Sequence, residues 1–189
     1  MKLREKNLKI LKNNNVYSEE MEHDACGVGV IVSTEGKKSR TIVEYGIEAL
    51  KAVWHRGAVD ADGKTGDGAG IHLEIPKDFF IEKIEVTGHE HDNSEICVGM
   101  IFLPRNDYSA QETCKTIVES ELTKNNFSIY GWRQVPVNPK ILGEKAFQTM
   151  PEIMQVLFKS NDKNLLDKNL ERKIYETRKK IENKAFQLS

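Results

Sequence analysis

Ala25-Cys26-Gly27-Val28-Gly29-Val30-Ile31-Val32-Ser33 is the stretch from which we infer the fold. Short apolar and β-branched residues interrupted by glycine predict a buried strand over 26–33, which another part of the backbone approaches closely. Cys26 stands at the first position of this strand, where the glycines leave open space around its sulfur. A lone cysteine is more often a buried structural residue than a reactive one, so the motif alone does not establish a site.

The residues that follow this stretch predict a turn and then an amphipathic helix. Residues 34–39 are polar and surround Gly36, which favours a turn. Apolar residues recur at three- and four-residue spacing over 41–54, as they do on the buried face of a helix. His55-Arg56-Gly57 ends this helix, with basic residues in the last turn and glycine beyond.

The same patterns predict the elements of the rest of the chain. We expect strands over 71–75, 96–103, 127–137 and 153–158. We expect helices over 76–84, 108–125 and 165–186. A loop rich in glycine and aspartate covers residues 60–70. This mixture of strands and helices predicts an α+β or layered α/β domain.

Composition bounds the class of protein. The 189 residues are 39% hydrophobic and 30% charged, which suits one globular domain and excludes a disordered chain. The net charge of −1 gives no indication of nucleic acid or an anionic membrane as partner. No apolar run approaches the ~20 residues of a membrane span, and residues 1–15 lack the apolar core of a secretory signal. We therefore expect a cytoplasmic protein whose three cysteines are free thiols.

Four blocks of sequence together resemble one known family. They are Ala25-Cys26-Gly27-Val28-Gly29, His55-Arg56-Gly57-Ala58, Thr65-Gly66-Asp67-Gly68-Ala69-Gly70 and Tyr130-Gly131-Trp132-Arg133-Gln134-Val135-Pro136-Val137. In this order and spacing they resemble the N-terminal part of the glutamate synthase large subunit, which opens with a class II glutamine amidotransferase domain. The likeness continues through Leu142-Gly143, Met150-Pro151 and Gln155-Val156 and covers most of residues 22–187.

The resemblance implies a fold and a set of site residues. The fold is the four-layer αββα sandwich of N-terminal-nucleophile hydrolases, incomplete here at the C-terminal end. Residues 1–25 would be a leader that is removed, and residues 26–189 the N-terminal portion of the amidotransferase domain. Cys26 would become the first residue and the catalytic nucleophile. Gly27 would let the substrate approach the sulfur, and Arg56 would hold the cysteine in position.

The resemblance also implies a reaction and partners. The domain would hydrolyse L-glutamine to glutamate and ammonia, which the remaining glutamate synthase domains or subunit use for reductive amination of 2-oxoglutarate. FMN and an iron–sulfur cluster are implied for the full-length family enzyme, so we expect no cofactor and no metal in this chain. The sequence has no counterpart of the family's Asn-Gly oxyanion-hole pair, so we expect the isolated chain to be inactive.

Two alternative functions remain open at this point. The first is another class II amidotransferase, although those usually begin with cysteine directly after the initiator methionine. The second is a non-catalytic remnant or binding fragment, which the missing Asn-Gly pair favours.

Three local motifs have competing interpretations. The block 65–70 lacks the Gly-Lys-Ser/Thr ending of a phosphate-binding loop, so we interpret it as a tight turn that shapes a pocket wall. His89-Glu90-His91-Asp92 could suggest a metal site, but adjacent side chains of an extended segment point in opposite directions, which favours a solvated loop. Trp132 and Arg133 lack the basic stripe of a nucleic-acid surface, so we expect core and surface roles for them.

Overall fold

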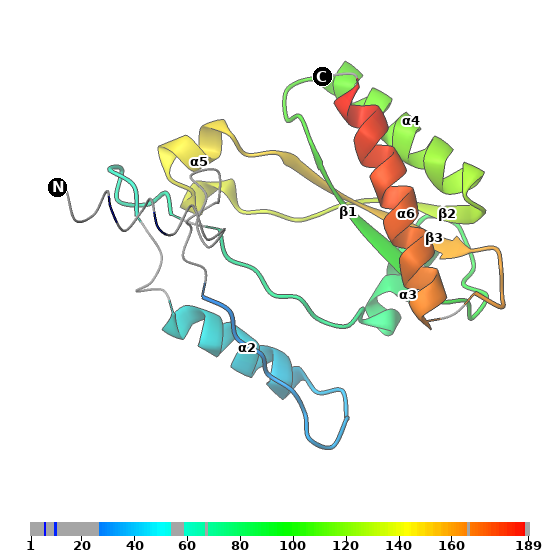
Figure 1. The fold of residues 1–189 in the computed structure, drawn as a ribbon, viewed down its shortest axis with the longest axis horizontal. Coiled ribbons are helices and arrows are strands. Elements are labelled where there is room, and N and C mark those ends of the chain that lie inside the picture. The colour runs from blue at the N-terminus through cyan, green and yellow to red at the C-terminus, as the bar shows by residue number, and fades with distance from the viewer. Residues whose placement is uncertain are drawn as a thin grey trace. The chain divides into compact units, whose positions relative to one another are not determined.

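The computed structural model describes Lys6, Ile10 and residues 27–53, 59–66, 68–165 and 167–187. Figure 1 shows the helices and strands of the chain. The chain divides into two units. One unit comprises Met1–Ala58 and Gly66–Ile71, and the other comprises Val59–Thr65 and His72–Ser189.

The first unit contains the predicted amphipathic helix, α2 (Arg40–Ala52). The hydroxyl of Ser39 caps its N-terminus by accepting a hydrogen bond from the backbone N–H of Thr41 at 3.2 Å. The turn before it is also confirmed, because the N–H of Gly36 donates to the carbonyl of Ser33 and Gly36 has a φ of +65°. That backbone conformation favours glycine over residues with a side chain.

Two of the predicted strands are wrong for the residues described. Residues 27–33 and 71–75 have no strand assignment. Val28 and Val30 are 89% and 80% exposed, so the segment 27–33 is not buried as the pattern predicted. A strand requires a hydrogen-bonded neighbour, and β-branched composition supplies only the tendency to be extended. Neither segment pairs with a strand among the described residues.

The second unit is built on a three-stranded antiparallel sheet with the order β1-β3-β2. Its strands are β1 (Cys97–Leu103), β2 (Phe127–Gln134) and β3 (Glu152–Ser160), which confirms three predicted strands. The central strand β3 pairs Val156 with Gly99 on one side and with Trp132 on the other. β2 ends earlier than predicted, before Pro136, because proline has no N–H to donate to a ladder.

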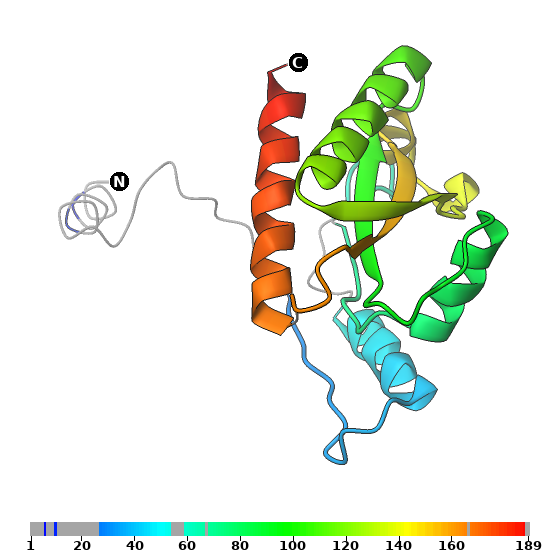
Figure 2. The same cartoon turned by 90° about the vertical axis from the view of Figure 1, so that its right-hand side faces the viewer.

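Helices cover both faces of this sheet (Figure 2). On one face lie α4 (Tyr108–Lys124) and α6 (Asp167–Phe186), and on the other lies α3 (Lys77–Val86). All three helices were predicted, so the mixed helix-and-sheet class is confirmed.

The side chains of β3 contribute to two cores. Val156 and Phe158 pack in a core with Val118, Leu122 and Leu170 of α4 and α6. Leu157 lies between them in sequence and packs on the opposite face, in a core with residues of α3. This alternation follows from the strand geometry, in which successive side chains point to opposite faces.

The connection from β2 to β3 contains two short elements that the sequence did not predict. They are the 3₁₀ helix η2 (Pro139–Ile141) and the α-helix α5 (Glu144–Gln148). Both are too short to show a hydrophobic period, which is why pattern analysis missed them.

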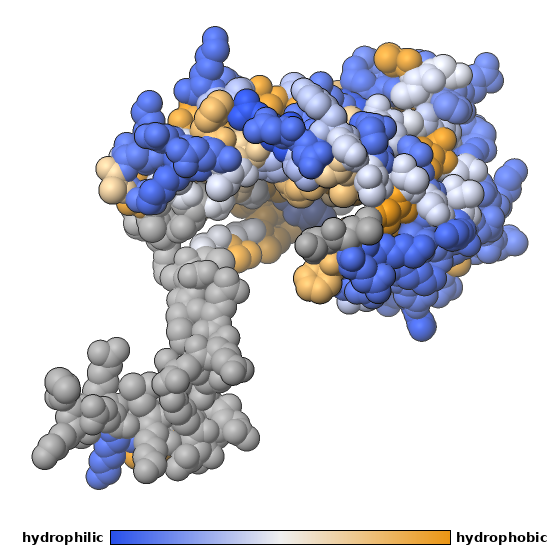
Figure 3. Space-filling view, turned by 90° about the horizontal axis from the view of Figure 1, so that it is seen from above, coloured by the Kyte–Doolittle hydropathy of each residue, from blue (hydrophilic) through white to orange (hydrophobic). Residues whose placement is uncertain are grey.

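The visible surface is mainly hydrophilic, with small hydrophobic areas between polar side chains (Figure 3). Among the described residues, no helix combines the length and the apolar character that crossing a membrane requires.

Candidate functional site

The predicted nucleophile, Cys26, and the predicted positioning residue, Arg56, lie outside the described residues. The same holds for His55 and Asp67. Gly27 is the predicted site residue that the structure describes. The catalytic assignment of Cys26 and the positioning role of Arg56 therefore stay predictions.

Gly27 lies beside the C-terminal end of α2. A Cβ atom built on Gly27 would be 3.6 Å from Cγ2 of Val53, the residue that caps this helix. That separation is an ordinary van der Waals contact, so a methyl group would fit. The contact brings the residue that follows Cys26 close to the residue that ends the helix, three positions before Arg56 in the sequence.

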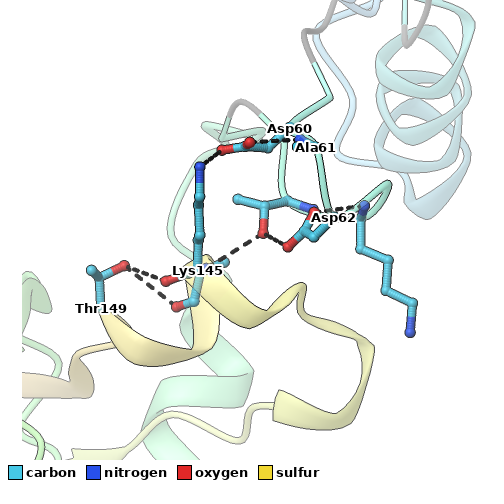
Figure 4. A network of polar contacts seen from close by, with 8 residues as sticks. Asp60, Ala61, Asp62, Lys145 and Thr149 are labelled. Carbon is cyan, nitrogen blue, oxygen red and sulfur yellow. Dashed lines mark hydrogen bonds and ion pairs between the residues drawn. The ribbon is translucent and has the colours of Figure 1, made fainter.

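The first part of the predicted glycine-rich loop is a tight turn over residues 60–65 (Figure 4). Oδ1 of Asp62 accepts from the backbone N–H groups of Lys64 and Thr65 at 2.9 Å and 2.7 Å. Oδ2 of Asp62 accepts from the hydroxyl of Thr65 at 2.5 Å. Gly63 has a φ of +69°, which suits glycine at the tip of the turn. The loop predicted over residues 60–70 is confirmed for its described residues, but the tight turn lies at 60–65, and the described residues of the block 65–70 form no turn. The role of that block as a pocket wall stays a prediction.

The start of α5 is bonded to this turn. The backbone N–H of Glu144, the first residue of α5, also contributes to lowering the pKa of the Asp62 carboxyl. Nζ of Lys145 lies 2.6 Å from Oδ2 of Asp60, and the N–H of Ala146 donates to the Thr65 hydroxyl at 3.5 Å. Figure 4 shows Lys145 extended from α5 toward Asp60. In the same view, Asp62 lies between the turn and the helix. We call these contacts the turn–α5 junction.

Sequence analysis missed the turn–α5 junction because its two halves are about eighty residues apart in the chain. The Asp62-Gly63 dipeptide signals the turn. No local pattern indicates that a turn at residue 62 meets a helix that begins at residue 144.

The electrostatics of the turn–α5 junction favour a charged Asp62. The hydroxyl of Thr65, followed by the N–H groups of Lys64, Thr65 and Glu144, lowers the pKa of the Asp62 carboxyl well below its ordinary value. Asp62 is therefore a carboxylate at neutral pH. It can hold N–H and O–H donors in place but cannot donate a proton in a reaction.

The His89-Glu90-His91-Asp92 segment is an irregular loop, as predicted, but it packs against the sheet. The rings of His89 and His91 lie 6.2 Å and 6.3 Å from the ring of Tyr130, centroid to centroid. Oδ2 of Asp92 lies 2.5 Å from Nζ of Lys159 on β3. Residues 27–53, 59–66, 68–165 and 167–187 contain no group of three or more histidine, cysteine or acidic side chains that could hold a metal ion.

The two described cysteines lie in separate elements. Cys97 is buried in β1, and burial followed by the charges of Glu95 and Glu171 raises the pKa of its thiol to about 12. Cys114 is half-buried in α4. An iron–sulfur cluster is held by several thiolates that converge on one point, so these two residues do not fit such a group.

Trp132 and Arg133 have the core and surface roles that were expected. Trp132 packs against the core between the sheet and helices α4 and α6, and its Nε1–H donates to Glu119 at 2.7 Å. Arg133 donates to Oε1 of Gln155 at 2.7 Å on the surface of the sheet.

Comparison with known proteins defines the class. Residues 26–189 match the model of the family described as glutamine amidotransferases class-II. The chain belongs to this family, and the match begins at Cys26.

Its curated relatives are glutamate synthases. The chain is 53% identical over 176 residues to the glutamate synthase [NADPH] large chain of Azospirillum brasilense, covering 93% of this chain and 12% of that protein. It is 38% identical over 175 residues to the ferredoxin-dependent glutamate synthase of Pyropia yezoensis, covering 92% and 11%. It is 40% identical over 162 residues to ferredoxin-dependent glutamate synthase 1, chloroplastic/mitochondrial, of Arabidopsis thaliana, covering 85% and 10%. The chain thus spans about one tenth of the length of these relatives, and the resemblance in its sequence blocks is confirmed.

Proposed function

We propose that this chain is the glutamine-hydrolysing part of a glutamate synthase, and that the complete enzyme converts L-glutamine to glutamate and ammonia at this part. The observation that carries the proposal is the family match, which begins at Cys26 and runs to the last residue. The three glutamate synthases described above favour this enzyme over other amidotransferases. In this proposal residues 1–25 are a leader whose removal makes Cys26 the N-terminal residue.

The chemistry of an N-terminal cysteine fits this reaction. The sulfur of Cys26 attacks the side-chain carbonyl carbon of glutamine, and its proton passes to the leaving nitrogen through the free α-amine. An α-amine has a pKa of ~7.7–8.0, so it exchanges protons near neutral pH, which an amide nitrogen cannot do. The C–N bond breaks and ammonia leaves. Water then attacks the thioester, which releases glutamate and restores the thiol.

Gly27 and Arg56 have supporting roles in this proposal. Gly27 leaves the space beside the sulfur open to the substrate, and Arg56 holds the backbone of Cys26. The contact of Gly27 with Val53 supports the second role, because Val53 and Arg56 lie close together in the sequence.

The partners follow from the relatives. We propose that the ammonia passes to the remaining domains or subunit of a glutamate synthase, where 2-oxoglutarate is aminated with the FMN and iron–sulfur cluster of those regions.

We further propose that the sheet β1-β3-β2 is one inner layer of the four-layer αββα sandwich. Met100 and Phe102 support this placement. They lie on the face of β1 that also carries α3, opposite to the core that contains Cys97. They are 48% and 64% exposed, so α3 leaves this part of the face uncovered. Apolar side chains on a sheet face favour a second layer packed against them.

The proposed function is tested on the longest form of the protein that its gene encodes. Intact-mass measurement of the purified protein should give a chain that begins at Cys26. A glutamine-analogue electrophile should modify Cys26, and Cys26→Ala should abolish both the modification and glutamine hydrolysis. Cys114→Ala is the matched control, because it removes a half-buried thiol from α4 and should preserve both.

Two outcomes would contradict the proposal. One is modification of Cys97 or Cys114 in place of Cys26. The other is undiminished hydrolysis of glutamine by Cys26→Ala, which would leave family membership without this nucleophile.

A further inference from the structure

The strand β1 is one edge of the sheet in the second unit, and no strand of the described residues pairs with its outer side. On its inner side β1 pairs with β3 from Cys97 to Leu103. No residue of β1 between Val98 and Phe102 is buried, whereas three successive residues of the central strand β3 are buried. The outer N–H and C=O groups of such an edge strand can pair with a further strand.

The two edges of this sheet differ in how well they are protected against pairing. The ladder of β2 is interrupted by an irregularity between Ile129 and Gly131, and β2 carries the cation of Arg133. Bulges and charged side chains are common means by which edge strands avoid pairing. The sequence of β1, Cys97–Leu103, contains no charge and no proline, and its register with β3 is unbroken. β1 is therefore the edge that is open to another strand.

The sequence of β1 is complementary to itself in an antiparallel pair centred on Met100. In that register Met100 lies opposite Met100 of a second copy, and Val98 lies opposite Phe102. An aromatic ring opposite a β-branched side chain is a favourable cross-strand pair. The pairing would also cover part of Met100 and Phe102, which are 48% and 64% exposed. No charged residues oppose one another within β1 itself.

The residues that flank β1 carry opposite charges in the same register. Glu95 precedes β1 by two residues and Arg105 follows it by two, so each lies opposite the other in a second copy. The side chain of Glu95 is 47% exposed, and its Oε1 lies 3.9 Å from Nζ of Lys77. The guanidinium of Arg105 lies over the ring of Phe147 at 4.5 Å and has no ion pair with a described residue. Two ion pairs would therefore form, one at each end of the paired strands.

Neighbouring registers do not match these charges. Centring the pair on Ile101 would place Glu95 opposite the carboxylate of Asp107, and like charges directly opposite each other are unfavourable. Centring it on Gly99 would place Glu95 opposite Leu103. The register centred on Met100 is thus the one of these three that pairs the charges.

We propose that β1 is an interaction surface for a second copy of this chain, with the two β1 strands paired antiparallel around Met100. The two sheets then form one continuous sheet with the order β2-β3-β1-β1-β3-β2. This contact lies at the edge of the sheet, so it leaves the sheet face free for a second layer. An interface one strand wide is small, and we expect a dissociation constant on the order of 10 μM.

Sedimentation equilibrium of the purified protein from ~1 to ~200 μM is the first measurement, and it should show a monomer–dimer equilibrium. Arg105→Glu and Glu95→Arg should each raise the dissociation constant about tenfold, because each replaces two attractive pairs by two repulsive ones. The double variant should return it to within about threefold of the unaltered protein.

The double variant separates pairing between copies from effects within one copy. Each single variant also loses a contact of its own chain, with Lys77 or with Phe147, and the second substitution does not restore that contact. Residues 95 and 105 are at opposite ends of an extended segment roughly 30 Å long, so they do not meet within one copy. Recovery in the double variant therefore reports a contact between two copies.

Cross-linking is the second measurement. Residues that oppose each other in an antiparallel pair have Cα atoms about 4.5–5.5 Å apart, which a disulfide can bridge. Met100→Cys should therefore form a covalent dimer under mild oxidation with copper–phenanthroline. The matched control is Tyr175→Cys, at a residue that is 56% exposed on α6, and it should link no more than the unaltered protein does.

Three results would overturn the inference. The first is a monomer at every concentration, which is also the result expected if another segment of the same chain pairs with β1. The second is a dimer whose dissociation constant does not respond to Arg105→Glu, or is not restored in the double variant. The third is equal cross-linking of Met100→Cys and Tyr175→Cys. Circular dichroism checks the folding of each variant, and if a charge variant does not fold, the cross-linking experiment decides alone.

Discussion

The backbone of Gly143 lies against the carboxylate of Asp62, so closely that a Cβ atom at residue 143 would come within 2.4 Å of Oδ2. Gly143 has a φ of −69°, which any residue can adopt. Space, and not backbone conformation, therefore requires glycine at this position. The relationship joins a turn early in the chain to a helix that begins much later, and it leads to the first prediction.

Gly143→Ala should destabilise the protein by about 1–3 kcal/mol, the usual effect of inserting a methyl group into a tightly packed position. Thermal unfolding monitored by circular dichroism measures the change. The matched control is Gly46→Ala in α2, where a Cβ atom would meet none of the described residues within 4 Å. Alanine in a helix interior is favoured over glycine by ~1 kcal/mol, so the control should not lower the midpoint. Equal midpoints for Gly143→Ala and the unaltered protein would show that the turn and α5 separate easily.

Leu157→Ala should cost about 2–5 kcal/mol, as the removal of a fully buried leucine from a core does. Leu157 is 0% exposed at the centre of the middle strand and packs with Phe80 and Ile84. Phe102→Ala is the control on the neighbouring strand, since Phe102 is 64% exposed and its loss should change stability much less. Urea unfolding measures both changes. A larger effect from Phe102→Ala would mean that a second layer already covers that face of the sheet.

Acid should destabilise the protein through Asp92 in addition to Asp62. The ammonium group of Lys159, followed by the hydroxyl of Ser94, lowers the pKa of Asp92 below its ordinary value. A carboxyl whose pKa is lower in the folded state stabilises that state above its unfolded pKa of ~3.9. This contribution is lost as the pH falls through the lower, folded-state pKa.

The acid effect is measured as the urea midpoint at a series of pH values from 7 downward. Asp92→Asn should lower the midpoint at pH 7 and should flatten the decline below about pH 5, because asparagine does not titrate. The double variant with Asp62→Asn should flatten the decline further. Curves that run parallel to that of the unaltered protein would mean that neither carboxyl carries the acid dependence.

Gly27→Ala should separate folding from activity. Among the described residues, the side-chain atom nearest to the new methyl group is 3.6 Å away on Val53. The free energy of unfolding should therefore change by less than ~0.5 kcal/mol, as measured by thermal unfolding. Glutamine hydrolysis should fall at least tenfold, because the methyl group would occupy the space beside the Cys26 sulfur in the proposed mechanism. Full activity in Gly27→Ala would remove Gly27 from the site while leaving the nucleophile untested.

Periodic patterns were sufficient to predict the helices and strands that bury one face along their whole length. The helix α4 and the strand β3 both carry an apolar pattern whose period matches their geometry, so the sequence predicts each of them. The pattern at 27–33 was equally clear and still predicted a strand wrongly. Hydrogen-bonded partners decide whether an extended segment becomes a strand, and a segment's own sequence does not name its partner.

For the candidate site, too, the sequence predicts some features and not others. The four blocks around Cys26, around Arg56, at 65–70 and at 130–137 together were sufficient to indicate the family, because chemistry requires particular residue types at fixed positions in the chain. Those blocks do not indicate which residues contact Asp62.

The sequence by itself determined the family, the mixed class of the fold and the residues proposed for catalysis. Tertiary structure decided the order β1-β3-β2, the burial of Leu157 and the contact of Asp62 with Gly143. The physical reason is the separation along the chain over which each effect acts. Propensity and periodicity act over a few neighbouring residues, whereas packing and hydrogen bonding join residues that are distant in the chain and leave no local signal.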